Sequence, residues 1–264
     1  MSVATPDRST LWLPLLRRLT ELSSDWTVWK NIDSAFTGGG DVDTVAPGED
    51  WPLIQNEFHT WAKGNGLGPV VPCPHAPFLL HLVALDPRAP NDTFFELDIN
   101  RRKVFLGSTL FVPADLRPLA GVYEQGFRRL RPGAEGLLKL VQNGTKRGGR
   151  IDPDGLRLKN IPQLLSEDWE GVQLTARLFK GAENAALRAA RSVIDGGWDR
   201  KASMKIEALS LARAIKEPGS VAARLRFRVN KRKCPVLRAV FESKRHVDPG
   251  PWLEEVAKTH EVLS

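Results

Sequence analysis

The feature that most constrains this chain is a glycine turn followed by two aspartates. Three consecutive glycines at residues 38–40 lead into Asp41-Val42-Asp43, and a β-type segment continues to residue 46. Successive side chains on a strand point to opposite faces, so Asp41 and Asp43 are expected on one face and Val42 on the other. Neighbouring carboxylates repel each other unless a cation lies between them. The pattern therefore predicts a site for a hard divalent cation such as Mg²⁺, or alternatively a turn with two solvated aspartates on an edge strand.

The overall composition is that of an ordinary globular protein. Of the 264 residues, 42% are hydrophobic and 26% are charged, which suits one large domain or two small ones. The two cysteines, Cys73 and Cys234, have no C-x-x-C spacing, so neither a disulfide scaffold nor a structural zinc site is indicated. No apolar window approaches the roughly 20 residues that a membrane helix needs. We therefore expect a cytoplasmic protein without a membrane partner.

Hydrophobic periodicity divides the chain into a strand-rich first part and a helix-rich second part. In the first part it predicts helices at 9–22, 31–36 and 51–62, strands at 26–29, 41–45, 70–71, 78–85 and 94–99, a proline-rich loop at 72–77 and an extended or hairpin segment at 122–130. In the second part it predicts helices at 134–141, 156–165, 169–179, 184–194, 203–215, 220–243 and 252–260.

These elements predict an α+β fold. The short connection between the strands at 78–85 and 94–99 favours an antiparallel pair, and hence a mixed sheet. The change of character at Pro132 places a domain boundary there. The prediction is an α/β domain built on a mixed β-sheet over residues 1–131, followed by an α-helical domain over residues 132–264.

A third aspartate has a position that could complete a metal site. Asp98 lies on the strand at 94–99, on the same face as Phe94 and Glu96, and this strand is expected beside that of Asp41 and Asp43. Three carboxylates on one face would suit two ions about 3.5–4 Å apart. The alternative is a strand-end aspartate that pairs with a neighbouring arginine.

The histidines show no metal-ligand spacing such as H-E-x-x-H. His81 lies inside the apolar strand at 78–85, a position typical of a hydrogen-bonded interior histidine. A functional role is the alternative if this strand borders the site.

The order of these elements resembles the DNA polymerase beta-like nucleotidyltransferase superfamily. The shared features are an apolar strand, a short helix, a glycine turn, a D-x-D strand, a helix and a later hydrophobic strand with a single aspartate, within residues 26–148. The similarity is greatest to small bacterial nucleotidyltransferases, including toxin-type members. The resemblance implies that Asp41, Asp43 and Asp98 are catalytic and bind two Mg²⁺ ions, with an NTP as the substrate.

The resemblance also implies which residues hold the triphosphate. Members of the superfamily carry a Gly-Ser or Lys-Gly pair before the D-x-D strand, and this chain has Lys30-Asn31 at that place. Toxin-type members carry a lysine on the helix that follows a Pro-Glu entrance, and Lys139 corresponds to it. An exposed lysine on an amphipathic helix is the alternative for Lys139. Replacement of the Gly-Ser pair leaves a catalytically degenerate member as the alternative for the whole chain.

The net charge of +7 suggests a polyanionic partner. The densest basic segment is expected to track an RNA or DNA backbone, with a solvated helix face as the alternative. Its candidate nucleic-acid residues are Arg224, Arg226, Arg228, Lys231, Arg232 and Lys233.

The predicted reaction is transfer of an NMP unit from an NTP to a hydroxyl of an acceptor. A tRNA or other RNA 3′ end suits the basic second part, while a small-molecule hydroxyl, as in antibiotic-modifying enzymes, and a protein hydroxyl are the alternatives. The resemblance to toxin-type members also leaves an antitoxin or another protein partner open.

Overall fold

The computed structural model describes residues 8–37, 40–76, 78–86, 94–219, 221–222 and 225. Its centre is a seven-stranded sheet in the order β3-β4-β5-β2-β1-β9-β8. The strands are β1 (Thr27–Lys30), β2 (Val42–Val45), β3 (Val70–Ala76), β4 (Leu79–Leu85), β5 (Phe94–Asn100), β8 (Ala120–Val122) and β9 (Arg128–Leu130). The pairs β2–β5 and β1–β9 are parallel and the other pairs are antiparallel. The predicted α+β class and mixed sheet are confirmed.

The antiparallel pairing of β4 with β5 is also as predicted. The loop predicted at residues 72–77 was wrong, because the chain forms strand β3 through Ala76. β3 pairs with one neighbour and lies at the edge of the sheet. Proline is tolerated in an edge strand because the N–H that it lacks would face outward. Pro72 and Pro74 therefore mark an edge strand here.

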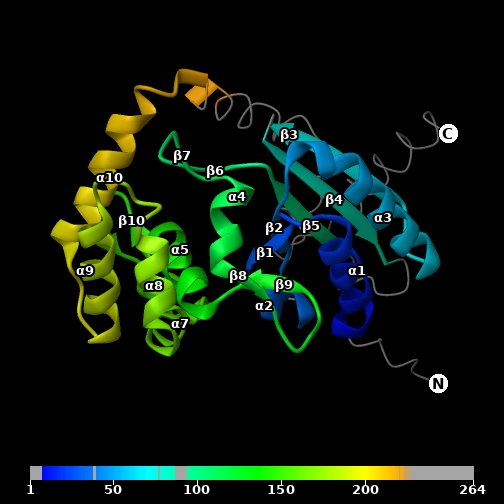
Figure 1. Cartoon of the computed structure of the whole chain (residues 1–264), viewed down its shortest axis with the longest axis horizontal. Helices are drawn as coiled ribbons and strands as arrows, with labels where there is room; N and C mark the ends of the chain where they lie inside the picture. The colour runs from blue at the N-terminus through cyan, green and yellow to red at the C-terminus, as the bar shows by residue number, and fades with distance from the viewer. Residues whose placement is uncertain are drawn as a thin grey trace.

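One face of the sheet packs against α1 (Arg8–Leu22) and α3 (Trp51–Gly64), which lie side by side over it (Figure 1). Alternating residues of the strands enter this core, as the period of two requires. Those from the middle of the sheet are Val28, Val42, Leu80, Leu82, Ala84, Phe95, Leu97 and Ile99. The intervening residues point to the opposite face, where the polar groups gather.

The second half of the molecule is helical. Its helices are α5 (Pro132–Asn143), α6 (Pro153–Leu158), α7 (Ile161–Glu167), α8 (Trp169–Ala176), α9 (Glu183–Ile194) and α10 (Arg200–Ala214). The single helix predicted at 156–165 is two helices, because Asn160 between them adopts a left-handed conformation (φ 53°). An isolated left-handed residue interrupts a right-handed helix.

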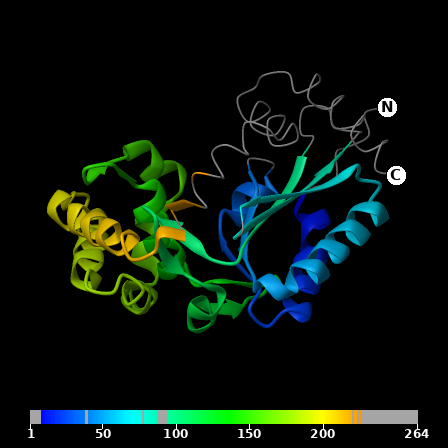
Figure 2. The ribbon, with the colours of Figure 1, turned by 90° about the horizontal axis from the view of Figure 1, so that it is seen from above.

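Short elements connect these parts. They are α2 (Ile32–Phe36), α4 (Pro113–Leu116), the 3₁₀ turns η1 (Gly48–Asp50) and η2 (Arg117–Leu119), and the hairpins β6 (Lys103–Phe105) with β7 (Ser108–Phe111) and β10 (Thr145–Lys146) with β11 (Arg150–Ile151). Figure 2 shows the sheet and the helical half side by side.

The two halves share a hydrophobic core at their junction. Trp29 of β1 and Val45 of β2 belong to the same buried cluster as Leu138 of α5 and Val172 of α8. The predicted boundary at Pro132 coincides with the first residue of α5. Whether each half is an independent domain stays a prediction.

Within the described part of the chain, none of the helices combines the length and the apolar character needed to cross a lipid bilayer.

Candidate metal centre

Four polar residues form a row across the face of the sheet that points away from α1 and α3. His81 of β4 lies opposite Asp98 of β5, Asp98 lies opposite Asp43 of β2, and Asp43 lies opposite Lys30 of β1. Directly opposed residues on paired strands have neighbouring side chains on the same face. Four neighbouring strands, β4, β5, β2 and β1, therefore fix this row without any contribution from a loop.

Asp41, the residue just before β2, lies next to this row. Carboxylate oxygens of Asp41, Asp43 and Asp98 all lie within 4.8 Å of one another. Burial raises the pKa of Asp43, the charge on Asp41 raises it further, and Lys30 opposes both effects. The predicted convergence of the three aspartates on one face is confirmed, and three oxygen donors at this spacing fit a hard divalent cation.

Lys30 reaches the row through an irregularity in β1. Val28 lies opposite Thr44 and Lys30 opposite Asp43, so Trp29 is an extra residue and the strand is bulged. Lys30 Nζ lies 3.0 Å from Asp43 Oδ2 and 4.7 Å from the centre of the Trp29 ring. Burial opposes the charge on Lys30, but Asp43 and Asp41 outweigh burial and raise its pKa. Lys30 is therefore a fixed cation beside the carboxylates.

Asn31 contacts the same oxygen of Asp43 as Lys30 does. Its side-chain Nδ2 donates a hydrogen bond of 2.9 Å to Asp43 Oδ2, and its backbone has φ 65° at the start of α2. Asparagine adopts this left-handed region more readily than most residues other than glycine. The backbone N–H of Asn31 donates to Glu135 Oε1 of α5.

Lys139 contacts the same carboxylate oxygen, Glu135 Oε1, that accepts the hydrogen bond from Asn31. Its Nζ lies 2.5 Å from Glu135 Oε1, one turn earlier on α5, and both side chains are buried. Arg129 of β9 lies 3.3 Å from the other oxygen of Glu135. Lys139 is thus not the exposed lysine of the alternative interpretation, and it lies where α5 meets the end of β1.

Two further lysines near the carboxylates were missed from the sequence. The pKa of Lys103 is lowered by burial and by Lys30, with Asp43, Asp98 and Asp41 opposing. The pKa of Lys159 is lowered by burial and then by Lys30 and Lys139. Lys103 lies on β6 and Lys159 directly after α6, so their distances from Asp41 in sequence gave no sign of their proximity to it.

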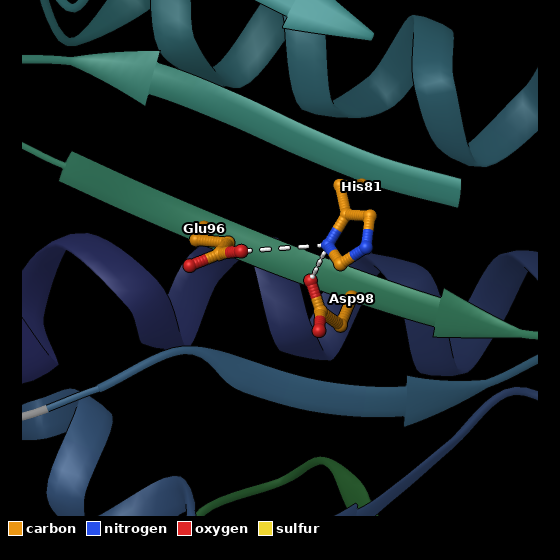
Figure 3. Close-up of side chains that lie close together, drawn as sticks. All are labelled: His81, Glu96 and Asp98. Atoms are coloured by element: carbon orange, nitrogen blue, oxygen red, sulfur yellow. Dashed lines mark hydrogen bonds and ion pairs between the residues drawn. The ribbon is translucent and has the colours of Figure 1, made fainter. Parts of the chain in front are cut away.

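His81 and Glu96 extend the acidic cluster toward β4. Figure 3 shows Glu96 and Asp98 on one face of β5, both directed at the ring of His81. His81 Nδ1 hydrogen-bonds Asp98 Oδ1 and lies 3.4 Å from Glu96 Oε1. Burial lowers the pKa of His81, but Asp98 and Glu96 together raise it to about 10. Burial raises the pKa of Asp98 to about 7, with Glu96 adding to burial and His81 opposing it.

The sequence leaves the role of His81 open and places Glu96 on the same face as Asp98 without indicating a function for Glu96. The alternation of Glu96 and Asp98 along β5 was the available signal. The pairing of His81 with Asp98 needed the register of β4 against β5, which the sequence did not define. The predicted nucleic-acid residues Arg224, Arg226, Arg228, Lys231, Arg232 and Lys233 lie outside the described residues.

Comparison with protein-family models and with curated proteins finds no match. Among solved structures, the crystal structure of JHP933 from Helicobacter pylori is similar to this chain. The two chains are 12% identical, the match covers 83% of this chain and 96% of that chain, and the TM-score is 0.41. A likeness at this level carries no argument about function, so the site must be interpreted from its own chemistry.

Proposed function

We propose that this protein is a metal-dependent nucleotidyltransferase of the DNA polymerase beta-like type. It would transfer an NMP unit from an NTP to a hydroxyl of an acceptor and release pyrophosphate. The observation that carries the proposal is the convergence of Asp41, Asp43 and Asp98 from the start of β2 and from β5, with carboxylate oxygens within 4.8 Å of one another. The D-x-D strand and the later strand with one aspartate are the elements in which this chain resembles that superfamily.

The three aspartates would hold Mg²⁺. Bound divalent ions in such a site neutralise the phosphates and stabilise the charge that develops on the transferring group. Asp41 and Asp43 supply oxygen ligands from β2 and the residue before it. Asp98 supplies a ligand from β5 and accepts the proton of the attacking hydroxyl.

The surrounding cations would hold the triphosphate. The resemblance suggests Lys30 and Lys139 for this role. Lys103 and Lys159 are further candidates, because both interact electrostatically with Lys30 and with the aspartates. Asn31 stands where related enzymes carry Gly-Ser, and its left-handed backbone is one that glycine would also adopt.

An RNA 3′ end, such as that of tRNA, is the acceptor that best suits a chain with a net charge of +7. The experiment is to incubate the protein with each α-labelled NTP, Mg²⁺ and total RNA, for the parent, Asp43→Asn and Asp154→Asn. Asp154 is an exposed aspartate on α6 and serves as the matched control. We expect label in RNA, a loss of about 100-fold or more in Asp43→Asn, and no change in Asp154→Asn.

A catalytically silent binding protein is the second candidate. Lys30 against Asp43 and His81 against Asp98 place cations beside two of the three carboxylates, as in a site that serves structure. NTP binding that depends on Mg²⁺, without transfer to any RNA or small-molecule hydroxyl, would favour this candidate. Absence of NTP binding in the presence of Mg²⁺ would overturn the proposal that the protein is a nucleotidyltransferase.

A further inference from the structure

The hairpin of β10 and β11 has a turn whose side chains are all basic. Residues 146–150, termed the basic turn below, read Lys-Arg-Gly-Gly-Arg. Lys146, Arg147 and Arg150 are all exposed. The hairpin follows α5 and lies next to α10 (Figure 1). Positive charge is thus concentrated on one short segment of the surface.

Two of the three cations have no ion pair within the described part of the chain. Lys146 Nζ lies 3.2 Å from Asp152 Oδ1, whereas no carboxylate pairs with Arg147 or Arg150. Arg150 Nε donates a hydrogen bond of 3.2 Å to the backbone oxygen of Arg147. A guanidinium has five N–H donors and stays charged, and its fork matches two oxygens of a phosphate. The two arginines therefore retain donors for an anion from solution.

The backbone of the basic turn is fixed to α10 and to the residues just before it. The two carboxylate oxygens of Glu207 accept hydrogen bonds of 2.9 and 3.0 Å from the N–H groups of Gly148 and Gly149. Trp198 Nε1 donates to Gly149 O, and Arg200 Nε donates to Gly148 O. A Cβ atom at Gly149 would lie 2.7 Å from Arg200 O, so the turn packs directly on the helix backbone. A surface turn held in this way presents its side chains from a fixed position, as a binding site requires.

Helix α6 connects the basic turn with the candidate metal centre. Asp152, the partner of Lys146, precedes α6, and Lys159 directly follows it. Lys159 interacts electrostatically with Lys139 and with Asp41. The six residues of α6 span about 9 Å, or about three nucleotides at roughly 3.4 Å each. A polynucleotide whose end lies at the centre therefore reaches the basic turn within a few nucleotides.

We propose that the basic turn binds the phosphate backbone of a single-stranded RNA, with Arg147 and Arg150 as the phosphate contacts. The RNA is the acceptor of the proposed transfer, so the placement of its 3′ end toward the three aspartates rests on that proposed function. Phosphate contacts position a strand without reading its sequence, so RNA of any sequence binds.

An anionic membrane also attracts basic residues. Helices that bind to membrane surfaces combine basic with apolar side chains, and the basic turn has no apolar side chain. The approach of Lys159 to the candidate metal centre also favours a strand that leads there over a flat lipid surface.

The experiment measures binding of a single-stranded RNA of about 16 nucleotides to the full chain over a range of salt concentrations. EDTA is present and NTP is left out, so that no transfer takes place. The variants are the double substitutions Arg147→Gln with Arg150→Gln, and Arg147→Lys with Arg150→Lys. The matched control is Arg18→Gln with Lys63→Gln, which removes two exposed cations from α1 and α3 on the other face of the sheet.

We expect the logarithm of the affinity to fall less steeply with the logarithm of the salt concentration in the double glutamine variant. The slope should decrease in magnitude by about 1.4, because each phosphate contact with a single strand contributes about 0.7. Between about 1 M and 0.1 M salt, this difference amounts to a loss of about 25-fold in affinity. The double lysine variant keeps both charges and should keep the slope, and the control should keep both the slope and the affinity.

An unchanged slope in the double glutamine variant would overturn the proposal, as would an equal change in the control or absence of RNA binding by the parent. A second arm uses vesicles of phosphatidylcholine with phosphatidylserine. Vesicle binding that the double glutamine variant loses, with its RNA binding unchanged, would assign the turn to a membrane surface and overturn the proposal. If the labelling experiment fails but the slope changes as expected, the proposed function is wrong and the RNA contact stands.

Discussion

At the scale of single residues, Lys30 determines the electrostatics of the candidate metal centre. Its Nζ lies 3.0 Å from Asp43 Oδ2, and the exposed fractions of the two side chains are 13% and 5%. A buried pair broken on one side leaves an uncompensated charge, which costs more than the pair itself contributes. Lys30 thus opposes the burial that raises the pKa of Asp43.

We predict that Lys30→Met destabilises the metal-free protein by about 3 kcal/mol, the lower end of the cost of breaking a buried pair. The free energy of unfolding in urea measures this effect. Addition of Mg²⁺ should offset part of the loss, because the ion supplies the charge that Lys30 provided. Lys146→Met is the control, since it removes an ion pair with Asp152 in which the lysine side chain is 55% exposed. An equal loss in both variants would contradict the prediction.

The sequence predicted the aspartates of this site but not the position of Lys30 relative to them. Asp41, Asp43 and Asp98 follow from strand alternation and from the adjacency of two strands. Strict alternation would have placed Lys30 on the face opposite to Trp29. The bulge at Trp29 turns Lys30 onto the face of Asp43, and a bulge depends on pairing with a partner strand.

At the scale of elements, the contact of α5 with α8 shapes the helical half. A Cβ atom at Gly133 would lie 1.9 Å from the carbonyl oxygen of Asp168 and 2.7 Å from the nitrogen of Val172. Both are backbone atoms, so the helix ends can approach this closely only without a side chain. The sequence predicted both helices, but the need for glycine at their contact arises from packing between segments distant in sequence.

Gly133→Ala should therefore destabilise the protein by about 3 kcal/mol, the upper part of the usual cost of overpacking. The matched control is Gly64→Ala at the end of α3, where an added Cβ meets nothing within 4 Å. That control should be neutral or stabilise by about 0.4–1 kcal/mol, since alanine restricts the unfolded chain. Thermal unfolding of both variants measures the difference, and similar effects at the two sites would refute this account of the helix contact.

The same contact has a predicted dependence on pH. Asp168 caps α8 at Gly171 N, accepts two hydrogen bonds from Arg131 at 2.8 and 2.6 Å, and accepts one from Gly133 N. Burial raises the pKa of Asp168, but the bonds from Arg131, Gly171 and Gly133 outweigh burial and lower it below its ordinary value. A carboxyl group whose pKa is lowered by folding stabilises the fold at pH values above its pKa in the unfolded chain, about 3.9. This stabilisation is lost as the pH falls through the pKa of the folded state.

Asp168→Asn should lower stability at pH 7 by about 1.5 kcal/mol, the lower end for hydrogen bonds to charged groups. The difference between parent and variant should shrink as the pH falls from about 4 to the lowered pKa of the folded state, where Asp168 of the parent becomes protonated. Urea unfolding at a series of pH values measures this difference. A constant difference between pH 7 and pH 2 would show that the charge on Asp168 does not stabilise the contact.

At the scale of the whole molecule, the candidate centre is assembled from both halves of the chain. Strands β1, β2, β4 and β5 supply the row from Lys30 to His81, and α5 supplies Lys139 and Glu135. The shared core of Trp29 with α5 and α8 holds these parts together. The sequence predicted the main strands and helices along the chain. The proximity of Lys103 and Lys159 to the centre depends on the tertiary fold.

Because the three aspartates meet only in the folded chain, Mg²⁺ should bind the folded state and raise its stability. A ligand at 100 times its Kd stabilises by about 2.7 kcal/mol if the unfolded chain does not bind it. We predict an increase of this size for the metal-free parent on saturation with Mg²⁺, measured by urea unfolding at constant ionic strength. Asp43→Asn should lose most of the increase, whereas Asp154→Asn should retain it. An equal increase in both variants would mean that Mg²⁺ acts elsewhere on the molecule and not between Asp41, Asp43 and Asp98.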